Sequence, residues 1–284
     1  MSALTATGAV LPRASRVRLR PGLILAGLFV AAVVVAALVP QLLAPHDPLQ
    51  IGAEGAFLPP GGSHLLGTDE SGRDVLSRMV YGARPSLVMG LGATAIAVTG
   101  GAVLGLAAGL GSRLTESLIM RLIDVVLSIP ELLLALVVIT LAGAGSTNAM
   151  FAVAFAGIPS YARIVRAQTH IVRRSTFVEA ATGLGIPRST VVWRHVLPNA
   201  IRPVLVLSTI GVGSAISAGA ALSFLGLGAE PPAAEWGDML SNGLQYISND
   251  WFLVAVPSVA ITLTVLSITV LGRELRRRSE GRTT

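Results

Sequence analysis

EAATGLGIPRSTVVWRHVLPN, from Glu179 to Asn199, is a polar and amphipathic stretch set between long apolar segments. A helix that begins at Thr176 carries Glu179 on its polar side, free to pair with a partner. We predict that its apolar face consists of Phe177, Ala180, Ala181 and Leu184. Gly185 suits the left-handed residue that ends a helix, and Pro187 prevents the helix from continuing.

A second short helix is predicted from Ser189 to His195, closed by Leu197 and Pro198. An arginine-rich helix–turn–helix between apolar segments has little purpose unless another molecule docks on it. The alternative is an ordinary amphipathic connecting loop.

This stretch resembles the EAA loop of ABC importer permeases, the cytoplasmic element that sits in a groove of the ATPase subunit. The family pattern is Glu-Ala-Ala, three residues, Gly, and a spacer that leads to an aliphatic residue and Leu-Pro. Here the aliphatic Val196 stands one place late and His195 occupies its usual position, a variant similar to the dipeptide, oligopeptide and nickel branch. The resemblance implies an ATPase-coupling loop made of Glu179, Ala180, Ala181, Gly185, Arg194, His195, Leu197 and Pro198.

The composition is that of a membrane protein. The chain has 284 residues, of which 52% are hydrophobic and 13% charged, and its mean hydropathy is +0.73. These values exclude a disordered chain and fit an ordinary soluble domain poorly. All 21 basic residues are Arg, and a phosphate-binding P-loop needs Lys. ATP and its Mg²⁺ are therefore expected on partner subunits, with no cofactor on this chain, and the absence of Cys removes disulfides and thiolate metal sites.

Six segments are long and apolar enough to cross a bilayer core, which needs roughly 20 residues per helix. They are Pro21–Leu43, Ser86–Gly111, Leu118–Ala142, Asn148–Gln168, Ile201–Gly226 and Phe252–Gly272. Pro159 is expected to interrupt the fourth. The first is too long for a signal peptide, so we expect it to be retained.

Arginine placement predicts the orientation. Residues 1–20 hold four Arg and no acid, and Arg163–Arg202 holds seven Arg against one Glu, whereas 228–250 holds four acids and no Arg. Both termini and the Glu179 loop are therefore expected in the cytoplasm of a prokaryotic cell, with the chain in the inner membrane. The expected parts are a basic tail 1–20, one six-helix domain 21–272 and a basic tail 273–284, with an outer segment 44–85, a coupling loop 169–200 and an outer loop 227–251.

The segment HLLGTDESGRDVLSRMVYGARPSL, from His64 to Leu87, resembles the stretch before the second span of peptide and nickel permeases. Asp69 and Ser71 are good helix caps, and an apolar stripe from Val75 to Val80 predicts an interfacial helix on the outer membrane surface. Its role is either to anchor the second span or to contact a binding protein. The residues assigned to this outer interface are Gly67, Thr68, Asp69, Gly72, Arg73, Asp74, Arg78, Arg84 and Trp236.

The third predicted span contains charged residues, which either stabilise helix packing or line a path for the solute. Arg121 and Asp124 are three residues apart, and we predict that they form a structural pair on one helix face. Glu131 lies near mid-membrane with no obvious partner, and such residues usually face a bundle interior or a water-filled path. We expect Glu131 to line the translocation path, where it attracts a peptide α-amino group or a cation; the alternative is a protonated or subunit-paired residue.

Near the end of the fifth span, ALSFLGLGAEPPAAEWGDML (Ala220–Leu240) also has a close family counterpart. Pro231 and Pro232 are expected to end that helix, and Trp236 and Trp251 suit the outer interface. The four His residues are scattered over loops, and no pair has metal-ligand spacing on one helix, so no metal site is expected.

These separated blocks together resemble a transmembrane permease, the C-type subunit, of a binding-protein-dependent ABC importer for dipeptides, oligopeptides or nickel. The resemblance implies the all-α type I importer fold with six transmembrane helices and a cytoplasmic EAA coupling helix. It also implies a sister permease, two ATPase subunits and an external solute-binding protein as partners, with no nucleic acid and no catalysis by this chain. The alternatives are a stand-alone secondary transporter or channel and, third, a membrane enzyme.

Overall fold

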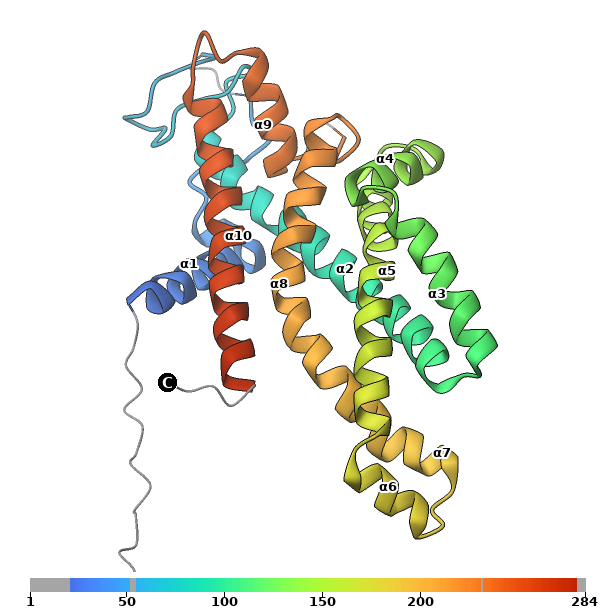
Figure 1. Ribbon diagram of the computed structural model, residues 1–284. Helices are drawn as coiled ribbons and strands as arrows, with labels where there is room; N and C mark the ends of the chain where they lie inside the picture. The colour runs from blue at the N-terminus through green and yellow to red at the C-terminus, as the bar shows by residue number, and fades with distance from the viewer. Residues whose placement is uncertain (1–20, 52–54, 231, 280–284) are drawn as a thin grey trace, which may run out of the picture.

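The computed structural model describes residues 21–51, 55–230 and 232–279, and within these ranges the chain is helical, without a β-strand. In Figure 1 the helices α5, α8 and α10 stand roughly upright and side by side, and α2 crosses behind α8 and α5. The elements are α1 Pro21–Leu38, η1 Pro40–Leu42, α2 Val75–Leu110, α3 Arg113–Leu127, α4 Glu131–Ala142, α5 Ser146–Arg173, α6 Thr176–Gly183, α7 Arg188–Val191, η2 Val192–Val196, α8 Leu197–Phe224, α9 Trp236–Gln245 and α10 Phe252–Ser279. The predicted all-α fold is confirmed.

In the part of the chain that the structure describes, five continuous helices are long and apolar enough to cross a membrane, namely α1, α2, α5, Arg188–Phe224 and α10. A sixth crossing requires α3 and α4 together, and these two helices are bent by 90° at a short break. The span expected over Leu118–Ala142 is therefore a broken one, made of two helices instead of a single continuous helix. Pro130 explains the break, because it lacks an N–H and disfavours helical backbone at Ile129.

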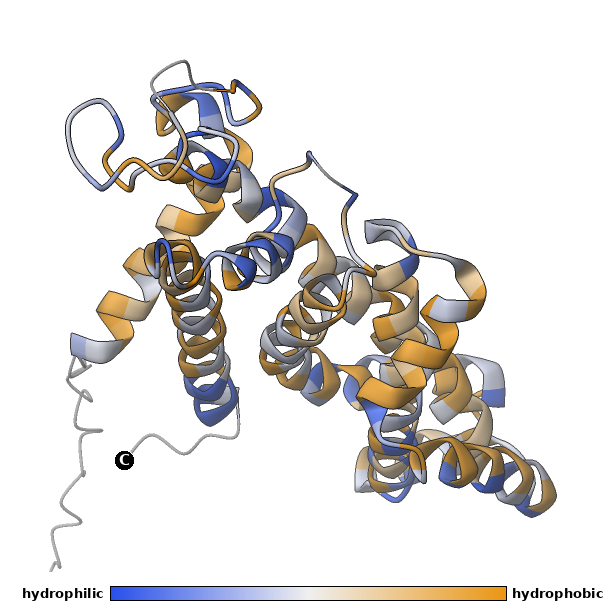
Figure 2. Cartoon of the chain, turned by 90° about the horizontal axis from the view of Figure 1, so that it is seen from above, coloured by the Kyte–Doolittle hydropathy of each residue, from blue (hydrophilic) through white to orange (hydrophobic). Residues whose placement is uncertain are grey.

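Two other helices run further than the sequence predicted. Pro159 does not interrupt the fourth span, since α5 continues through it and buries it. Helices inside a bundle tolerate proline because neighbouring groups satisfy the freed backbone. The last helix, α10, passes the expected end at Gly272 and reaches Ser279, and its polar C-terminal end is blue in Figure 2.

The second long helix absorbs the interfacial helix predicted before it. α2 begins at Val75 and runs without a break to Leu110, although it contains Pro85. Its N-cap is Asp74, whose carboxylate accepts a hydrogen bond from the Ser77 N–H at 2.7 Å, so the prediction of Asp69 or Ser71 as the cap is wrong. Asp69 instead accepts from the Ser71 and Arg73 N–H groups inside the preceding turn.

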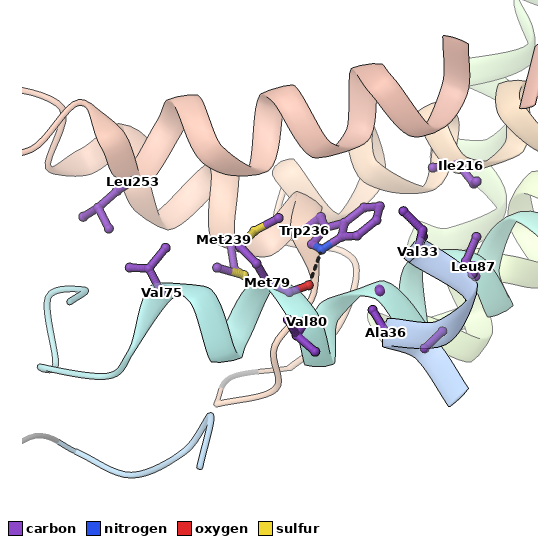
Figure 3. Packing of buried hydrophobic residues seen from close by; sticks show 12 residues of the cluster. Val33, Ala36, Val75, Met79, Val80, Leu87, Ile216, Trp236, Met239 and Leu253 are labelled. Atoms are coloured by element: carbon purple, nitrogen blue, oxygen red, sulfur yellow. Dashed lines mark hydrogen bonds between the residues drawn. The ribbon is translucent and has the colours of Figure 1, made fainter. Parts of the chain in front are cut away.

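The described residues of 44–74 and α9 form a cap beside the N-terminal ends of α2 and α10 (Figure 1). Figure 3 shows Trp236 within the hydrophobic cluster under this cap, with its indole directed at Met79. Trp236 is 3% exposed, and its indole N–H donates to the Met79 carbonyl at 2.9 Å. It packs in a cluster that joins α1, α2, α9 and α10. The expectation that Trp236 faces the membrane interface is therefore wrong, because this residue fastens α9 to α2.

A glycine stripe brings α2 and α5 into close contact. A Cβ on Gly101 or Gly105 would lie within 3 Å of backbone atoms of Ala162, and a Cβ on Gly109 would lie 2.8 Å from the Thr169 side chain. Glycines four residues apart let two helices approach at backbone distance in a membrane. The stripe therefore fixes the two helices that run between the cap and the opposite end of the molecule.

Candidate functional site

The segment Thr176–Val196, here called the helical hairpin, lies at the end of α5 and α8 that is far from the cap (Figure 1). Its first helix ends as predicted. Gly185 has a φ of +76°, its N–H donates to the Thr182 carbonyl at 3.0 Å, and the Ile186 N–H donates to the Ala181 carbonyl at 3.2 Å. These two bonds make a Schellman motif, so the predicted left-handed Gly185 is confirmed.

The second arm of the hairpin differs from the prediction. A short α7 passes into one π-helical turn, η2, and then directly into α8, so Leu197 and Pro198 do not close a helix. Pro198 is the second residue of α8 and directly follows the π turn. Val191 and Val196 are five residues apart and both buried, a spacing that fits one π turn.

The hairpin has a small core of its own and leaves other apolar groups outside. The core residues are Val172, Val178, Ala181, Val191, Val196 and Ala200. Phe177, Leu184 and Trp193 are 46%, 81% and 69% exposed. Of the predicted apolar face only Ala181 is buried, whereas Phe177, Ala180 and Leu184 are exposed. Val178 fills the other inward position.

Polar groups of the hairpin face outward as well. Glu179 and Arg194 are exposed, and neither forms a hydrogen bond or ion pair within the described residues. His195 is half-buried, with its ring centroid 6.3 Å from that of Phe177. The surface of the hairpin thus combines unpaired charge with exposed aromatic and aliphatic side chains, which is the composition of a protein-binding patch.

Two arginines attach the hairpin region to α2. Arg173 Nη1 donates to the Gly109 carbonyl at 2.6 Å, and Arg188 Nη2 donates to the Leu110 carbonyl at 3.1 Å. Cations at a helix C-terminus satisfy its last carbonyls and complement its dipole. A displacement of the hairpin is therefore transmitted to α2 as well as to α5 and α8.

A cavity of about 380 Å³ lies between α2, α4, α5 and α8, and Arg276 near the end of α10 also lines it. Glu131, at the first position of α4, lines it together with Thr94, Ser160 and Tyr161. The Thr94 hydroxyl is buried there and has no hydrogen-bond partner within the described residues. The structure places Glu131 where a path through the helices is expected, and contact between this residue and a solute stays a prediction.

The pair predicted between Arg121 and Asp124 is not formed. Asp124 instead forms an ion pair with Arg163 of α5. Both partners are more than half exposed, so the pair contributes little stability by itself. The pair links α3 to α5, so a contact between two helices takes the place of the contact expected within one helix.

The residues assigned to the outer interface divide into a buried network and one exposed residue. Arg73 Nε lies 2.7 Å from Asp69 Oδ2, and Arg78, only 3% exposed, reaches the same oxygen at 3.4 Å. Arg78 also donates to the carbonyls of Pro48 and Pro232. Arg84 is exposed and lies outside this network.

Two turns and one threonine complete the network. Gly67 and Gly72 have φ values of +76° and +75°. A Cβ on Gly67 would meet the Leu58 carbonyl at 2.3 Å. The Thr68 hydroxyl, fully buried, donates to Gly55 O and accepts from the Leu58 N–H. These residues hold the cap together; contact with an external protein remains a separate expectation.

Asp238 is buried in the cap, and its ionisation is expected to make the stability of the protein depend on pH. Burial, and then the negative charge of Glu235, raises the pKa of Asp238. An acid with a raised folded pKa loses its proton first in the unfolded state, so the free energy of unfolding falls as pH rises from about 3.9 to the folded pKa. Asp238→Asn keeps an oxygen that accepts the hydrogen bond from the Asn242 amide. Because asparagine does not titrate, the free energy of unfolding of this variant does not undergo that fall with rising pH.

We therefore expect Asp238→Asn to melt at a higher temperature than the wild type at pH 7. The difference between the two melting temperatures is expected to shrink as the pH falls from the pKa of Asp238 in the folded protein towards about 3.9. Thermal melting of the purified protein at a series of pH values measures this. Asp47→Asn, at an exposed position, is the matched control. A difference that is the same at every pH contradicts the prediction.

The structure also assembles a group that the sequence did not predict. His46 and His64, expected on separate loops, lie with ring centroids 4.8 Å apart, and both approach Asp74. Burial raises the pKa of Asp74, but hydrogen bonds from Ser77 and His64 outweigh it, so its pKa lies below the ordinary value. Spacing along a helix could not reveal a cluster that two loop segments and a helix cap form together.

The order of the helices and the hairpin between α5 and α8 match known proteins. Residues 83–283 match the family described as "Binding-protein-dependent transport system inner membrane component". The chain belongs to this family. The match covers the cavity, the hairpin and all helices from α3 onward.

Curated relatives of this permease cover most of its length. The probable D,D-dipeptide transport system permease protein DdpC of Escherichia coli is 40% identical over 234 residues, which is 82% of this chain and 78% of that protein. The glutathione transport system permease protein GsiD of Pectobacterium atrosepticum is 39% identical over 76% of this chain and 72% of its own. The motif resemblance to a peptide-type permease is thereby confirmed.

Solved structures agree on the fold. The inward-facing methionine ABC transporter MetNI superposes with a TM-score of 0.57 at 20% identity, over 70% of this chain and 94% of that chain. An amino acid ABC transporter gives a TM-score of 0.53 at 19% identity, over 68% and 90%. The permease thus has the architecture of importer transmembrane subunits.

Proposed function

We propose that this chain is one membrane-spanning subunit of an ATP-driven importer that takes up peptides delivered by an external binding protein. A sister permease completes the conduit, and two ATPase subunits bind the ATP and Mg²⁺. The helical hairpin couples those ATPases to the spans. The chain itself catalyses no reaction, and it lies in a prokaryotic inner membrane with the hairpin and both termini in the cytoplasm.

The observation that carries this proposal is the continuity between hairpin and cavity. The hairpin joins α5 directly and, through Arg188–Phe224, is one helix with α8. The same two helices line the cavity through Gly157 and Tyr161 on one side and Gly211 on the other. When ATP draws the ATPases together, the hairpin moves as a rigid unit and displaces both walls of the cavity. Such rigid-body displacement of packed elements is a common basis of two-state transport.

Peptides are the solutes that the relatives' names favour. Those names include dipeptide, di/tripeptide and glutathione transport. The cavity is lined by one carboxylate, Glu131, by one guanidinium, Arg276, and by several hydroxyls. Such a lining suits a zwitterionic solute that carries both a free α-amino group and a free carboxylate. Nickel complexes remain the other solute class of the branch that the motifs resemble.

The direct test is uptake by reconstituted complexes. Proteoliposomes that contain this chain, its sister permease and both ATPases are expected to accumulate labelled dipeptides when ATP and the binding protein are supplied. A panel of dipeptides, oligopeptides and a nickel chelate identifies the solute class. Uptake at full rate by this chain alone would support a stand-alone transporter or channel and refute the proposal.

Glu131 is expected to attract the solute's positive charge. Glu131→Gln removes that charge from the cavity wall but keeps its shape, and a hydrogen bond to a charged group is worth about 1.5–3 kcal/mol. We therefore expect uptake of dipeptides with a free amino group to fall about tenfold or more. Glu230→Gln, at an exposed position outside the cavity, is the control. Unchanged transport of every solute in the panel would end this role for Glu131.

A further inference from the structure

We propose that the cap holds a divalent transition-metal ion of the zinc type between His46, His64 and Asp74. Within the described residues, these three side chains form the group whose ligand atoms converge, all lying within 4.8 Å of one another. The site is distinct from the cavity and the hairpin, and it adds a structural ion to a subunit whose proposed transport role does not require one.

The distances are close to those of a preformed site. His64 Nδ1 lies 2.9 Å from Asp74 Oδ1, and His46 Nδ1 lies 3.8 Å from Asp74 Oδ2. Zinc bonds to imidazole nitrogen and carboxylate oxygen are about 2.0–2.2 Å long, so a small inward movement of the His46 ring completes three bonds. The ion replaces the proton that His64 and Asp74 otherwise share, as metals do when they bind protonated ligands.

His46 is the residue that a simple hydrogen-bond network does not explain. Its Nδ1 is buried and has no hydrogen-bond partner within the described parts of the chain. A buried polar atom without a partner is unfavourable, and an ion between the rings supplies the missing bond. The two rings are tilted by 35° at a centroid separation of 4.8 Å.

Ser77 holds the ligands in position. Its hydroxyl and its N–H both donate to Asp74 Oδ2, at 2.6 and 2.7 Å, which leaves Oδ1 directed at His64. The same hydroxyl accepts a hydrogen bond from the His46 backbone N–H at 3.0 Å. Outer groups that orient metal ligands in this way are typical of genuine metal sites.

The ligand set selects the type of ion. Two imidazoles and one carboxylate suit zinc and its neighbours, whereas Ca²⁺ and Mg²⁺ prefer oxygen ligands alone. His64 and Asp74 are 8% and 2% exposed, while the His46 side chain is 34% exposed beside an open groove lined by Ala44, Pro48 and Tyr81. The ion enters from that groove and fastens the 44–51 segment to the start of α2.

The test is zinc binding by the purified complex. The complex is prepared with an affinity tag that lacks histidine, stripped of metal by a chelator, and titrated with zinc chloride in a calorimeter. Because the chain has no Cys and four His, few other groups on it compete. We expect the wild type to bind one zinc ion more per copy of this chain than the His46→Gln/His64→Gln double variant. We also expect zinc to raise the melting temperature of the wild type but not that of the double variant.

The single variants locate the ion. His46→Gln or His64→Gln is expected to weaken zinc binding at least about 100-fold, and Ser77→Ala about tenfold, since outer partners alone contribute about 10–100-fold. His170→Gln, which removes a histidine that contacts Glu116 far from the cap, is expected to bind zinc like the wild type. Circular dichroism of each metal-free variant confirms that it is folded. Equal zinc stoichiometry in the wild type and the double variant would overturn the proposal.

Discussion

Replacing Trp193 by alanine is expected to weaken binding of this permease to its ATPase subunits by about 30-fold or more, and to reduce ATP-driven uptake with it. Trp193 is 69% exposed on the π turn of the hairpin, beside unpaired Arg194. Exposed Trp residues that become buried at a protein interface often contribute about 2 kcal/mol or more, which is about 30-fold in affinity. The measurement is the affinity of the purified ATPase for permease complexes in nanodiscs, followed by uptake in proteoliposomes.

The chain offers a matched control for this substitution. Trp251 is 61% exposed, and it lies at the start of α10, at the cap end of the molecule. Trp251→Ala removes the same side chain from a comparable surface without touching the hairpin. If the two variants bind the ATPase equally well, Trp193 does not belong to the docking surface, and the coupling role of the hairpin loses its main support.

The hairpin also shows what the sequence could predict and where it failed. The turn at Gly185 was predictable because a glycine followed by an apolar residue and a proline is a local signal for a helix end. The exposure of Trp193 was not, because helical periodicity assumes 3.6 residues per turn. The π turn accommodates one additional residue, which explains why the aliphatic Val196 stands one place later than in the family pattern and is nevertheless buried.

Two prolines show that local sequence rules also predict the course of the membrane-spanning helices only in part. Pro130 and Pro159 each follow an apolar helical segment, yet the chain bends by 90° beside the first and continues through the second. α5 lies along the glycine stripe of α2, and close packing on that side maintains the helix through Pro159. A local rule for proline therefore gives the right result only where no tertiary packing opposes it.

In the cap, contacts between segments distant in the sequence determine where Trp236, His46 and His64 lie. Trp236 was expected at the lipid interface because exposed tryptophans gather there, but its indole N–H reaches a carbonyl of α2 that is 157 residues away in the chain. His46 and His64 meet for the same reason, through loops whose course depends on the buried Asp74. Composition and periodicity predict that such residues exist, whereas the folded chain determines which of them meet.

Gly105→Val is expected to have the largest effect on assembly, because it separates α2 from α5. A Cβ at this position would stand 2.6 Å from the Ala162 carbonyl oxygen and 2.6 Å from Val165 Cβ. The first contact is with backbone, so rotation of a side chain cannot relieve it and the helices must move apart. Overpacking of this kind costs about 1–3 kcal/mol, which corresponds to a lowering of the melting temperature by roughly 2–10 °C.

The measurement is the melting temperature and the fraction of monodisperse complex after purification. Gly27→Val is the matched control, because Gly27 also lies in a spanning helix but has no neighbouring atom within 4 Å of the position that a Cβ would occupy. Since α2 and α5 both line the cavity, the surviving fraction of Gly105→Val complexes is also expected to transport poorly even when the ATPases bind normally. A Gly105→Val complex as stable and as active as Gly27→Val would show that the close approach of α2 and α5 is needed neither for assembly nor for transport.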